Sequence, residues 1–370
     1  MGNTINKKLF GLDHLRAVAI LFVFFFHYFI LSNATLKWLP NFLKFGWTGV
    51  DLFFVLSGFL ISVQLFLPIK LNQAIPIKQF FLKRFFRIIP LYLVVVCIYF
   101  CMPFFREKEN LPPLWKFLTF TQNIGLDLNA FGAFSHAWSL CVEEHFYLLF
   151  PFILFLLHYT GLLKRAYWLV LAIFLLGFAT RFYSFTQLYI PRIGQENGWM
   201  YWYKHIYYPT YNRLDGILVG VSIAAVYVFL PNVWNRIRNY GNFIFGFGLL
   251  ILAGCYFLCY DKTAFNASIF GFPLIAIGYG FVVAAAVSET SFLYKWNSRL
   301  TTFIATISYS VYLTHKGVIH LTLTFLSDYV MHNNVRLLIC MITCISFAYL
   351  LHFIVERPFM KWRSRMIEAK

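Results

Sequence analysis

Charged residues are scarce in this 370-residue chain. Only 12% of its residues are Asp, Glu, Lys or Arg, and only 14 are acidic, whereas a soluble globular domain contains about 25% charged residues. Hydrophobic residues make up 60% of the chain, and the mean hydropathy is +0.68. This composition excludes an ordinary soluble domain and predicts an all-α, polytopic integral membrane protein.

Cysteine patterns that would indicate a zinc site or a secreted disulfide framework are absent. The chain has seven cysteines, and most fall in pairs at helical i, i+4 spacing within apolar stretches, where a thiol behaves as a small hydrophobic group. We therefore predict no metal site. Internal repeats, low-complexity segments and linkers are also absent, which predicts one transmembrane domain over residues 1–370 with no additional soluble domain.

Long apolar runs dominate what is present. About 20 consecutive apolar residues are needed to cross a hydrocarbon core of about 30 Å, and about ten stretches of the chain meet this requirement. The predicted spans lie near residues 15–33, 46–67, 88–105, 138–157, 166–185, 212–230, 242–260, 268–288, 301–325 and 335–355.

The net charge of +17 could suggest a nucleic-acid partner, but in a membrane protein basic residues first report topology. Most of the 31 Lys and Arg residues fall in the connections that are cytoplasmic when the N-terminus is inside. We therefore predict that both termini are cytoplasmic and that nucleic acid is not a partner. Lys7 and Lys8 precede an apolar run that is too long for a signal peptide and lacks a clear cleavage site, so the first span is predicted to be a retained anchor.

Arg16 and His27 lie on the first predicted span, separated by about 16 Å along a helix axis. One side chain would lie at a membrane surface and the other well inside the bilayer. An ionisable group at that depth is costly, and it indicates a functional site whose partners lie on other spans.

Other spans bring ionisable groups to the predicted depth of His27. Each has a simpler explanation when taken alone: Asp51 can cap a helix, Glu143 and Glu144 can begin a solvated helix, and His27 can bond between helices. Their convergence favours a buried polar cluster on a substrate or proton path. The converging residues are His27, Asp51, Glu143, Glu144, Asn212, Arg213, Asp215 and His315.

Several sequence motifs occur in the order typical of one known family. The chain resembles the bacterial membrane acyltransferase-3 family, and the resemblance extends from residue 11 to Pro358. The motifs are Arg16 with His27, GVDLFFVLSG at residues 49–58, RFFRIIPLY at 84–92, TQN at 121–123, WSLCVEE at 138–144, RLDG at 213–216 and SYSVYLTH at 308–315.

The resemblance implies an enzyme of the bacterial cytoplasmic (inner) membrane. Such an enzyme takes an acyl group, usually acetyl, from cytoplasmic acyl-CoA and delivers it to a carbohydrate hydroxyl on the other side. Acyl-CoA is then a co-substrate, and no permanently bound cofactor is expected. The resemblance also implies that Arg16 and His27 are essential and that Arg84 and Arg87 match the family's basic pair.

The residues themselves suggest how these roles could be divided. Arg84 and Arg87 are one helical turn apart and suit the phosphates of CoA, and Arg16, on the same side, is predicted to help bind acyl-CoA. Without the family resemblance, an anchor to anionic lipid would be the favoured interpretation of the basic pair. His27 can act as the base. Asp51 is the preferred carboxylate to orient it, with Glu143 or Glu144 as the alternative. Candidates for holding the acceptor are Asn123, His136, Trp138, Arg213 and His315.

Two questions stay open at the level of sequence. His27 can deprotonate the acceptor hydroxyl for direct attack, or it can itself be acylated and pass the group on. Buried Asp, Glu and His residues are also typical of a proton-coupled transporter or a flippase of a glycan precursor. The absence of an inverted repeat argues against transport. Neither the acceptor nor the oligomeric state follows from the sequence.

Overall fold

The computed structural model describes residues 9–32 and 40–368, and every regular element within these ranges is helical. This confirms the predicted all-α class. Lys7, Lys8 and the last residue of the first predicted span lie outside the described residues. Each predicted span coincides with one long helix. These are α1 (Phe10–Ser32), α2 (Gly49–Lys70), α3 (Ile77–Cys101), α5 (Trp138–Tyr159), α6 (Ala166–Tyr183), α8 (Asp215–Phe229), α10 (Gly241–Leu258), α11 (Phe272–Ala286), α13 (Arg299–Phe325) and α14 (Asn333–Leu351).

Shorter helices connect or extend the long ones. Those used below are η1 (Asn41–Thr48), which leads into α2, η3 (Ser135–Ala137), which leads into α5, and the π-helical η7 (Tyr203–Tyr207). The remaining α-helices are α4 (Leu114–Leu118), α7 (Trp199–Trp202), α9 (Pro231–Arg238), α12 (Phe292–Lys295) and α15 (Arg357–Glu368).

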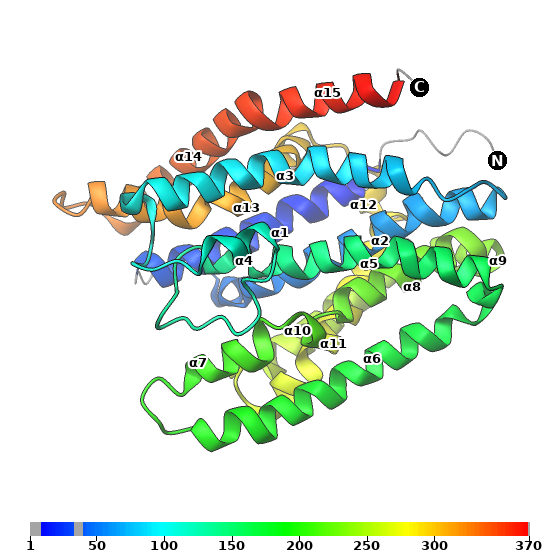
Figure 1. Ribbon diagram of the computed structural model, residues 1–370, viewed down its shortest axis with the longest axis horizontal. Coiled ribbons are helices and arrows are strands. Elements are labelled where there is room, and N and C mark those ends of the chain that lie inside the picture. The colour runs from blue at the N-terminus through cyan, green and yellow to red at the C-terminus, as the bar shows by residue number, and fades with distance from the viewer. Residues whose placement is uncertain (1–8, 33–39, 369–370) are drawn as a thin grey trace.

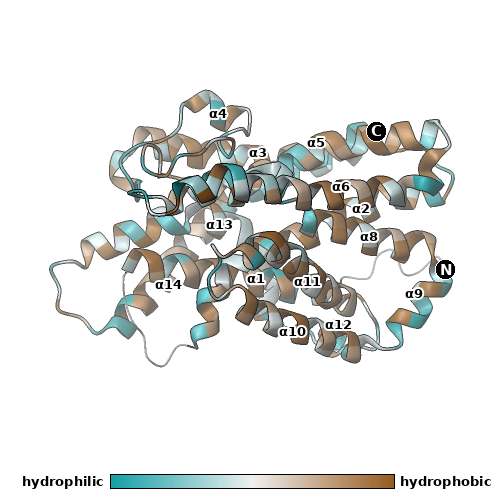
Figure 2. Ribbon diagram, turned by 90° about the horizontal axis from the view of Figure 1, so that it is seen from below, coloured by the Kyte–Doolittle hydropathy of each residue, from teal (hydrophilic) through white to brown (hydrophobic). Residues whose placement is uncertain are grey.

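Eight helical segments of the described chain are long and apolar enough to cross a membrane. The bent pair α8 and α9, which meet at 107°, gives a ninth if it counts as one span. Hydrophobic residues dominate α10 and α11, whereas α9 is largely hydrophilic (Figure 2). The 27-residue α13 is not among these segments, because Ser, Thr, Tyr, His and Lys interrupt its apolar residues.

The long helices run broadly along one axis of the molecule (Figure 1). The beginning of α1 and the end of α15 point towards the same end of it, as expected if both chain ends lie on one side of the membrane. The helix α3 begins at Ile77 rather than near residue 88, because the basic segment before the apolar run is also helical. Long basic side chains can extend to the interface from such a segment.

Glycines allow the helices α2 and α8 to approach closely. A Cβ at Gly58 of α2 would lie 2.2 Å from the carbonyl oxygen of Ile217, and one at Gly220 of α8 would lie 2.3 Å from that of Val55. Gly216 and Gly220 form a G-x-x-x-G pattern, which allows helix backbones in a membrane to approach closely. The α2–α8 pair therefore holds the start of both helices, where Asp51 and Arg213 lie, at a fixed separation.

We expect Gly58→Val to destabilise the protein by about 1–3 kcal/mol, since the added side chain would overlap the backbone of α8. Thermal unfolding of the purified protein in detergent measures this. Gly254→Val is the matched control, because Gly254 is a helical glycine with open space around it. Equal melting temperatures for the two variants would contradict the assigned role of this contact.

Candidate active site

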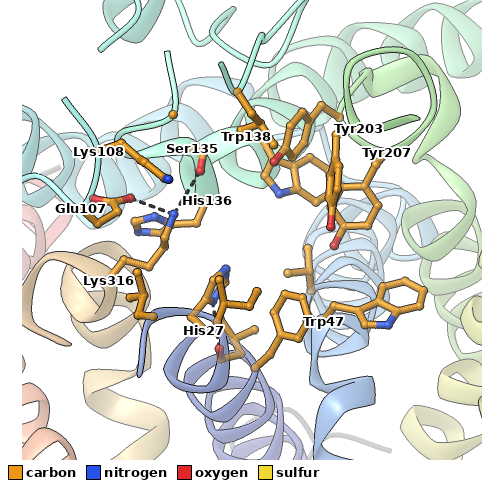
Figure 3. Close-up of a pocket in the computed structure, with 18 of the residues that line it drawn as sticks. His27, Trp47, Glu107, Lys108, Ser135, His136, Trp138, Tyr203, Tyr207 and Lys316 are labelled. Atoms are coloured by element: carbon orange, nitrogen blue, oxygen red, sulfur yellow. Dashed lines mark hydrogen bonds and ion pairs between the residues drawn. The ribbon is translucent and has the colours of Figure 1, made fainter. Parts of the chain in front are cut away.

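A cavity of about 290 Å³ lies at the end of the bundle where α1 ends and α2 begins. Its walls come from segments that are far apart in sequence. Figure 3 shows the His27 ring directed into the open space between Lys316 and Trp47. Aromatic side chains form most of the opposite wall, and they include Trp138, Trp199, Tyr203, Tyr207 and Tyr208.

Three imidazoles gather beside this cavity. The ring centroid of His315 lies 4.8 Å from those of His27 and His136, and the His27 and His136 centroids are 6.0 Å apart. His27 and His136 line the cavity, whereas the fully buried His315 lies behind them. The structure thus joins α1, η3 and α13 at a single histidine cluster.

Hydrogen bonds fix the tautomers of two of these rings. Nδ1 of His315 lies 2.8 Å and 3.1 Å from the carbonyl oxygens of Tyr312 and Val311, so it must carry a proton, because a carbonyl only accepts. Nε2 of the neutral His315 ring is then an acceptor, and it lies 3.0 Å from Nδ1 of His27. Nδ1 of His27 also lies 3.0 Å from the carbonyl of Val23, so it too is the protonated nitrogen. The remaining nitrogen of His27, Nε2, is therefore left without a proton.

Asp51 does not hold His27 in place. Oδ1 of Asp51 accepts from Arg213 at 2.7 Å, and its Oδ2 has no hydrogen-bond partner. The Arg213 guanidinium lies over the rings of Phe272, Tyr207 and Trp138, with its carbon 4.0, 4.6 and 5.2 Å from their centroids. Arg213, predicted as an acceptor ligand, thus lies behind the aromatic wall and supports it. His315 takes the position that was predicted for a carboxylate.

A second buried ion pair joins α6 to the same region. Arg181, which is fully buried, donates to Asp215 at 2.6 Å and to the carbonyl oxygen of Asn212 at 2.9 Å. Sequence reasoning missed Arg181, although an arginine within an apolar span is itself a signal of a buried partner.

Asn123 also supports the wall rather than facing the cavity. Its amide donates to the carbonyl oxygen of Tyr208 at 3.1 Å and to the hydroxyl of Thr210 at 2.9 Å. Among the predicted acceptor residues, therefore, His136 and Trp138 line the cavity, while Asn123, Arg213 and His315 lie behind it.

The paired glutamates belong to a different cluster, nearer the start of α1. Glu143 accepts from the hydroxyl of Tyr147 at 2.6 Å and interacts electrostatically with Arg84 and Arg16. Glu144 also interacts with Arg84. The groups predicted to lie at one depth thus lie at two. His27, His136 and His315 lie near the end of α1, whereas the paired glutamates lie near its start with Arg16, Arg84 and Arg87.

Arg84 and Arg87 lie close to Arg16. Arg16 is within electrostatic range of both side chains and of Tyr147. Nη2 of Arg84 donates to Gln64 at 3.2 Å, and its guanidinium lies 5.5 Å from the Tyr147 ring centroid. The guanidinium groups of Arg16, Arg84 and Arg87 therefore lie close together, and the nearby carboxylates of Glu143 and Glu144 partly offset their mutual repulsion.

One face of α13 connects the two clusters. The hydroxyl of Tyr309 donates to the carbonyl oxygen of Ile88 at 3.0 Å and lies within electrostatic range of the paired glutamates. One turn further along, the hydroxyl of Tyr312 donates to the carbonyl oxygen of His136 at 2.7 Å. The same hydroxyl lies 2.5 Å from the hydroxyl of Ser139. Tyr312 lines the cavity, whose lining includes none of the three arginines. This bonded tyrosine therefore lies between the cavity and the basic cluster.

Sequence reasoning missed a charged pair beside the histidines. Nζ of Lys316 lies 2.8 Å from Oε1 of Glu107 and donates to the hydroxyl of Ser135 at 3.1 Å. Gly317 makes this pairing possible, because a Cβ there would lie 2.2 Å from the ring of Phe105, which precedes Glu107 in the same loop. Lys316 could have been found, since a lysine inside a predicted span indicates a functional position.

Metal chemistry has no obvious location in the part of the chain that the structure describes. No group of three or more His, Cys, Asp and Glu residues there is arranged to hold a metal ion.

Comparison with known proteins agrees with this arrangement. The sequence model of the acyltransferase-3 family, described as an acyltransferase domain, matches residues 9–353. The chain belongs to this family. Its apolar helices are therefore those of an acyltransferase domain embedded in the membrane.

Curated relatives include proteins of Staphylococcus aureus. The "Putative O-acetyltransferase SAR0937" of strain MRSA252 is 29% identical over 96% of this chain and 59% of its own length. The "O-acetyltransferase OatA" of strain NCTC 8325 is 26% identical over 96% of this chain and 58% of its own length. The chain thus spans less than three fifths of these curated relatives. No solved structure matches it.

The Asp51–Arg213 pair gives a stability prediction. Asp51→Asn and Arg213→Met should each destabilise the protein by about 3–5 kcal/mol, because each leaves an uncompensated buried charge. The double variant should lose less than the sum of the two single variants. Thermal unfolding in detergent of all four proteins measures the coupling. Strictly additive losses, or an Asp51→Asn protein with unchanged stability and no activity, would contradict a structural role.

Proposed function

We propose that this chain is an O-acetyltransferase that moves an acetyl group from cytoplasmic acetyl-CoA to a carbohydrate hydroxyl on the other side of the bacterial cytoplasmic membrane. The observation that carries the proposal is the unprotonated Nε2 of His27, on a ring that lines an aromatic cavity and is held by His315. Membership of the acyltransferase family and relatives named as O-acetyltransferases support the reaction class.

The transfer step uses groups already in place. Nε2 of His27 takes the proton of the acceptor hydroxyl as its oxygen attacks the thioester carbonyl. The Lys316 ammonium, fixed by Glu107 and Ser135, is positioned to stabilise the negative charge on the carbonyl oxygen of the tetrahedral intermediate. Collapse of the intermediate breaks the carbon–sulfur bond, forms the ester and returns the proton from His27 to the CoA thiolate.

The basic cluster at the start of α1 is the proposed site for the CoA phosphates. Guanidinium groups pair with phosphate through two parallel hydrogen bonds, and Arg16, Arg84 and Arg87 converge there. The helix α15 adds Arg363, which lies within electrostatic range of Arg87, because Trp362 packs on Phe86 of α3 with ring centroids 5.3 Å apart. Placing this end in the cytoplasm agrees with the predicted location of both termini.

The acyl arm must then travel from the basic cluster to His27. The polar face of α13 that bears Tyr309 and Tyr312 is the proposed route, since it touches both sites. Because Tyr312 is bonded to Ser139 and to the backbone of His136, its side chain would swing aside as the thioester arrives. Acceptor and donor would thus meet at His27 from opposite faces of the membrane.

The proposal is tested with purified protein, acetyl-CoA and extracted bacterial surface glycans. His27→Ala should lower acetyl transfer by about 10²–10⁴-fold, the usual contribution of a general base, with the melting temperature unchanged. Mass spectrometry of the glycan and release of the CoA thiol measure the two halves of the reaction. His320→Ala, on the same helix as His315 but outside the cavity, is the matched control and should retain activity.

Radiolabelled acetyl-CoA without acceptor separates the two mechanisms. Label retained on the wild-type protein and absent from His27→Ala would assign His27 as an acyl carrier, and unlabelled protein that still acetylates glycan would assign direct transfer. Full transfer activity in His27→Ala, or glycan transport across proteoliposomes without acetylation, would contradict the proposal.

A further inference from the structure

We propose that the acceptor is an acidic carbohydrate, whose carboxylate or phosphate group binds Lys262 while its hydroxyl faces His27, and that Lys108 adds positive charge from the side of the cavity that bears Glu107. The inference deepens the proposed function and rests on it for the identity of the cavity as the acceptor site. It comes from the excess of positive charge in the cavity lining, which a neutral sugar would not compensate.

Lysines outnumber carboxylates in the cavity lining. Lys108, Lys262 and Lys316 face one carboxylate, Glu107. Glu107 is committed to Lys316 at 2.8 Å and also accepts from the backbone N–H of Phe134 at 3.1 Å. Two ammonium groups in the lining are therefore left without a carboxylate partner among the cavity residues.

Lys262 is held among aromatic rings instead of by an acid. Its Nζ donates to the hydroxyl of Tyr203 at 2.5 Å and lies 4.9, 5.6 and 5.9 Å from the ring centroids of Tyr203, Phe26 and Trp202. Lys262 is half-buried, and aromatic faces stabilise a cation only partly, so an anionic ligand would add to the stabilisation of this ammonium. This ammonium is fixed in position and available to a ligand.

The methylene chain of Lys108 packs against Gly132 at the edge of the cavity. A Cβ on Gly132 would lie 2.9 Å from Cγ of Lys108, so the absence of a side chain at that glycine leaves room for the methylene chain. Both residues line the cavity, and Lys108 is exposed. Its ammonium lies on the side that bears Glu107 and Ser135 (Figure 3).

Two carboxylates next to cavity residues in sequence, Asp127 and Asp261, already accept hydrogen bonds from other residues. Asp127, next to the lining residue Leu128, is paired with Lys204 at 3.3 Å. Although burial alone would raise the pKa of Asp127, hydrogen bonds from the backbone of Asn129 and Ala130 and the neighbouring Lys204 hold it below its usual value. Asp261, next to Lys262, accepts from the backbone and hydroxyl of Thr263 at 2.9 and 2.6 Å.

The aromatic wall suits a sugar ring. Trp138 and Tyr207 lie with centroids 4.8 Å apart, and Trp47 lies 6.1 Å from Tyr207. Such rings offer an apolar face together with polar edges, which matches a pyranose that has one apolar face and hydroxyls around its rim. Arg213 fixes this wall from behind. Aromatic stacking would thus orient the sugar ring, and the two lysines would favour sugars that bear an anionic group.

The test compares three methyl glycosides that share one ring: a neutral glucoside, a glucuronide and a glucoside 6-phosphate. Ligand-observed NMR titration of the wild-type protein in detergent gives each dissociation constant without requiring transfer. At least one acidic ligand should bind about tenfold more tightly than the neutral one, and added salt should reduce this preference. The tighter acidic ligand distinguishes a carboxylate from a phosphate acceptor.

Variants localise the preference. Lys262→Gln should bring the ratio of the neutral to the acidic dissociation constant close to one. Lys108→Gln should also reduce this ratio. Because Lys108 is exposed, its variant keeps the test possible if Lys262→Gln folds poorly. Lys44→Gln, which removes an exposed lysine of η1 outside the cavity, is the matched control and should keep the wild-type ratio.

Equal affinities of the wild-type protein for all three ligands, or a preference unaffected by both cavity variants, would overturn the inference. Its failure is distinguishable from failure of the proposed function. Acetyl transfer to glycans without any acidic preference would refute the inference alone. Tight binding of acidic ligands by a protein that transfers no acetyl group would refute the proposed function alone.

Discussion

The hydrogen bond between Nδ1 of His27 and Nε2 of His315 is the interaction on which the rest of the site depends. His315 is itself oriented by the carbonyl oxygens of its own helix, so α13, together with the carbonyl of Val23 on α1, determines which nitrogen of His27 carries the proton. Catalytic histidines are commonly oriented by a carboxylate, and here a second, neutral imidazole takes that place. A neutral partner avoids the desolvation cost of a buried anion.

The fold is arranged to hold α1 and α13 together while leaving the cavity open. The helix α13 packs between α1 and α14, which explains how so polar a sequence remains buried. On the other side, glycines bring α2 against α8, and the Asp51–Arg213 and Arg181–Asp215 pairs tie α2, α6 and α8 to one another. The charged residues there support the aromatic wall, and the histidines opposite are left for chemistry.

Much of the fold followed from hydropathy. The apolar runs predicted every long helix, because the length needed to cross a bilayer is a strong constraint. The spacing of Arg16 and His27 predicted that they lie at different depths, and the structure places Arg16 in the basic cluster and His27 at the cavity. What could not be predicted was the partner of each buried group, since depth along a span does not fix its rotation or its neighbours. Asp51 was thus assigned to His27, with Glu143 or Glu144 as the alternative, whereas Asp51 pairs with Arg213 and both glutamates join the arginine cluster.

Loop residues were the least accessible to sequence reasoning. Glu107 lies outside the helices, and the contact of Phe105 with Gly317 helps to bring it to Lys316. Lys262 likewise enters the cavity from the connection after α10. Both positions depend on long-range packing, for which the hydrophobic pattern of a single sequence carries no signal.

The most direct test of the account is the turnover of acetyl-CoA by His315→Leu and His315→Gln. Leucine removes one of the two acceptors that hold Nδ1 of His27 and leaves the carbonyl of Val23 as the other. With the ring less firmly oriented, kcat should fall by about 10²-fold or more, while KM for acetyl-CoA should stay near its wild-type value. Glutamine can still accept from His27 and donate to the α13 carbonyls, so it should restore part of the lost kcat. Wild-type kcat in a folded His315→Leu protein would contradict the central claim.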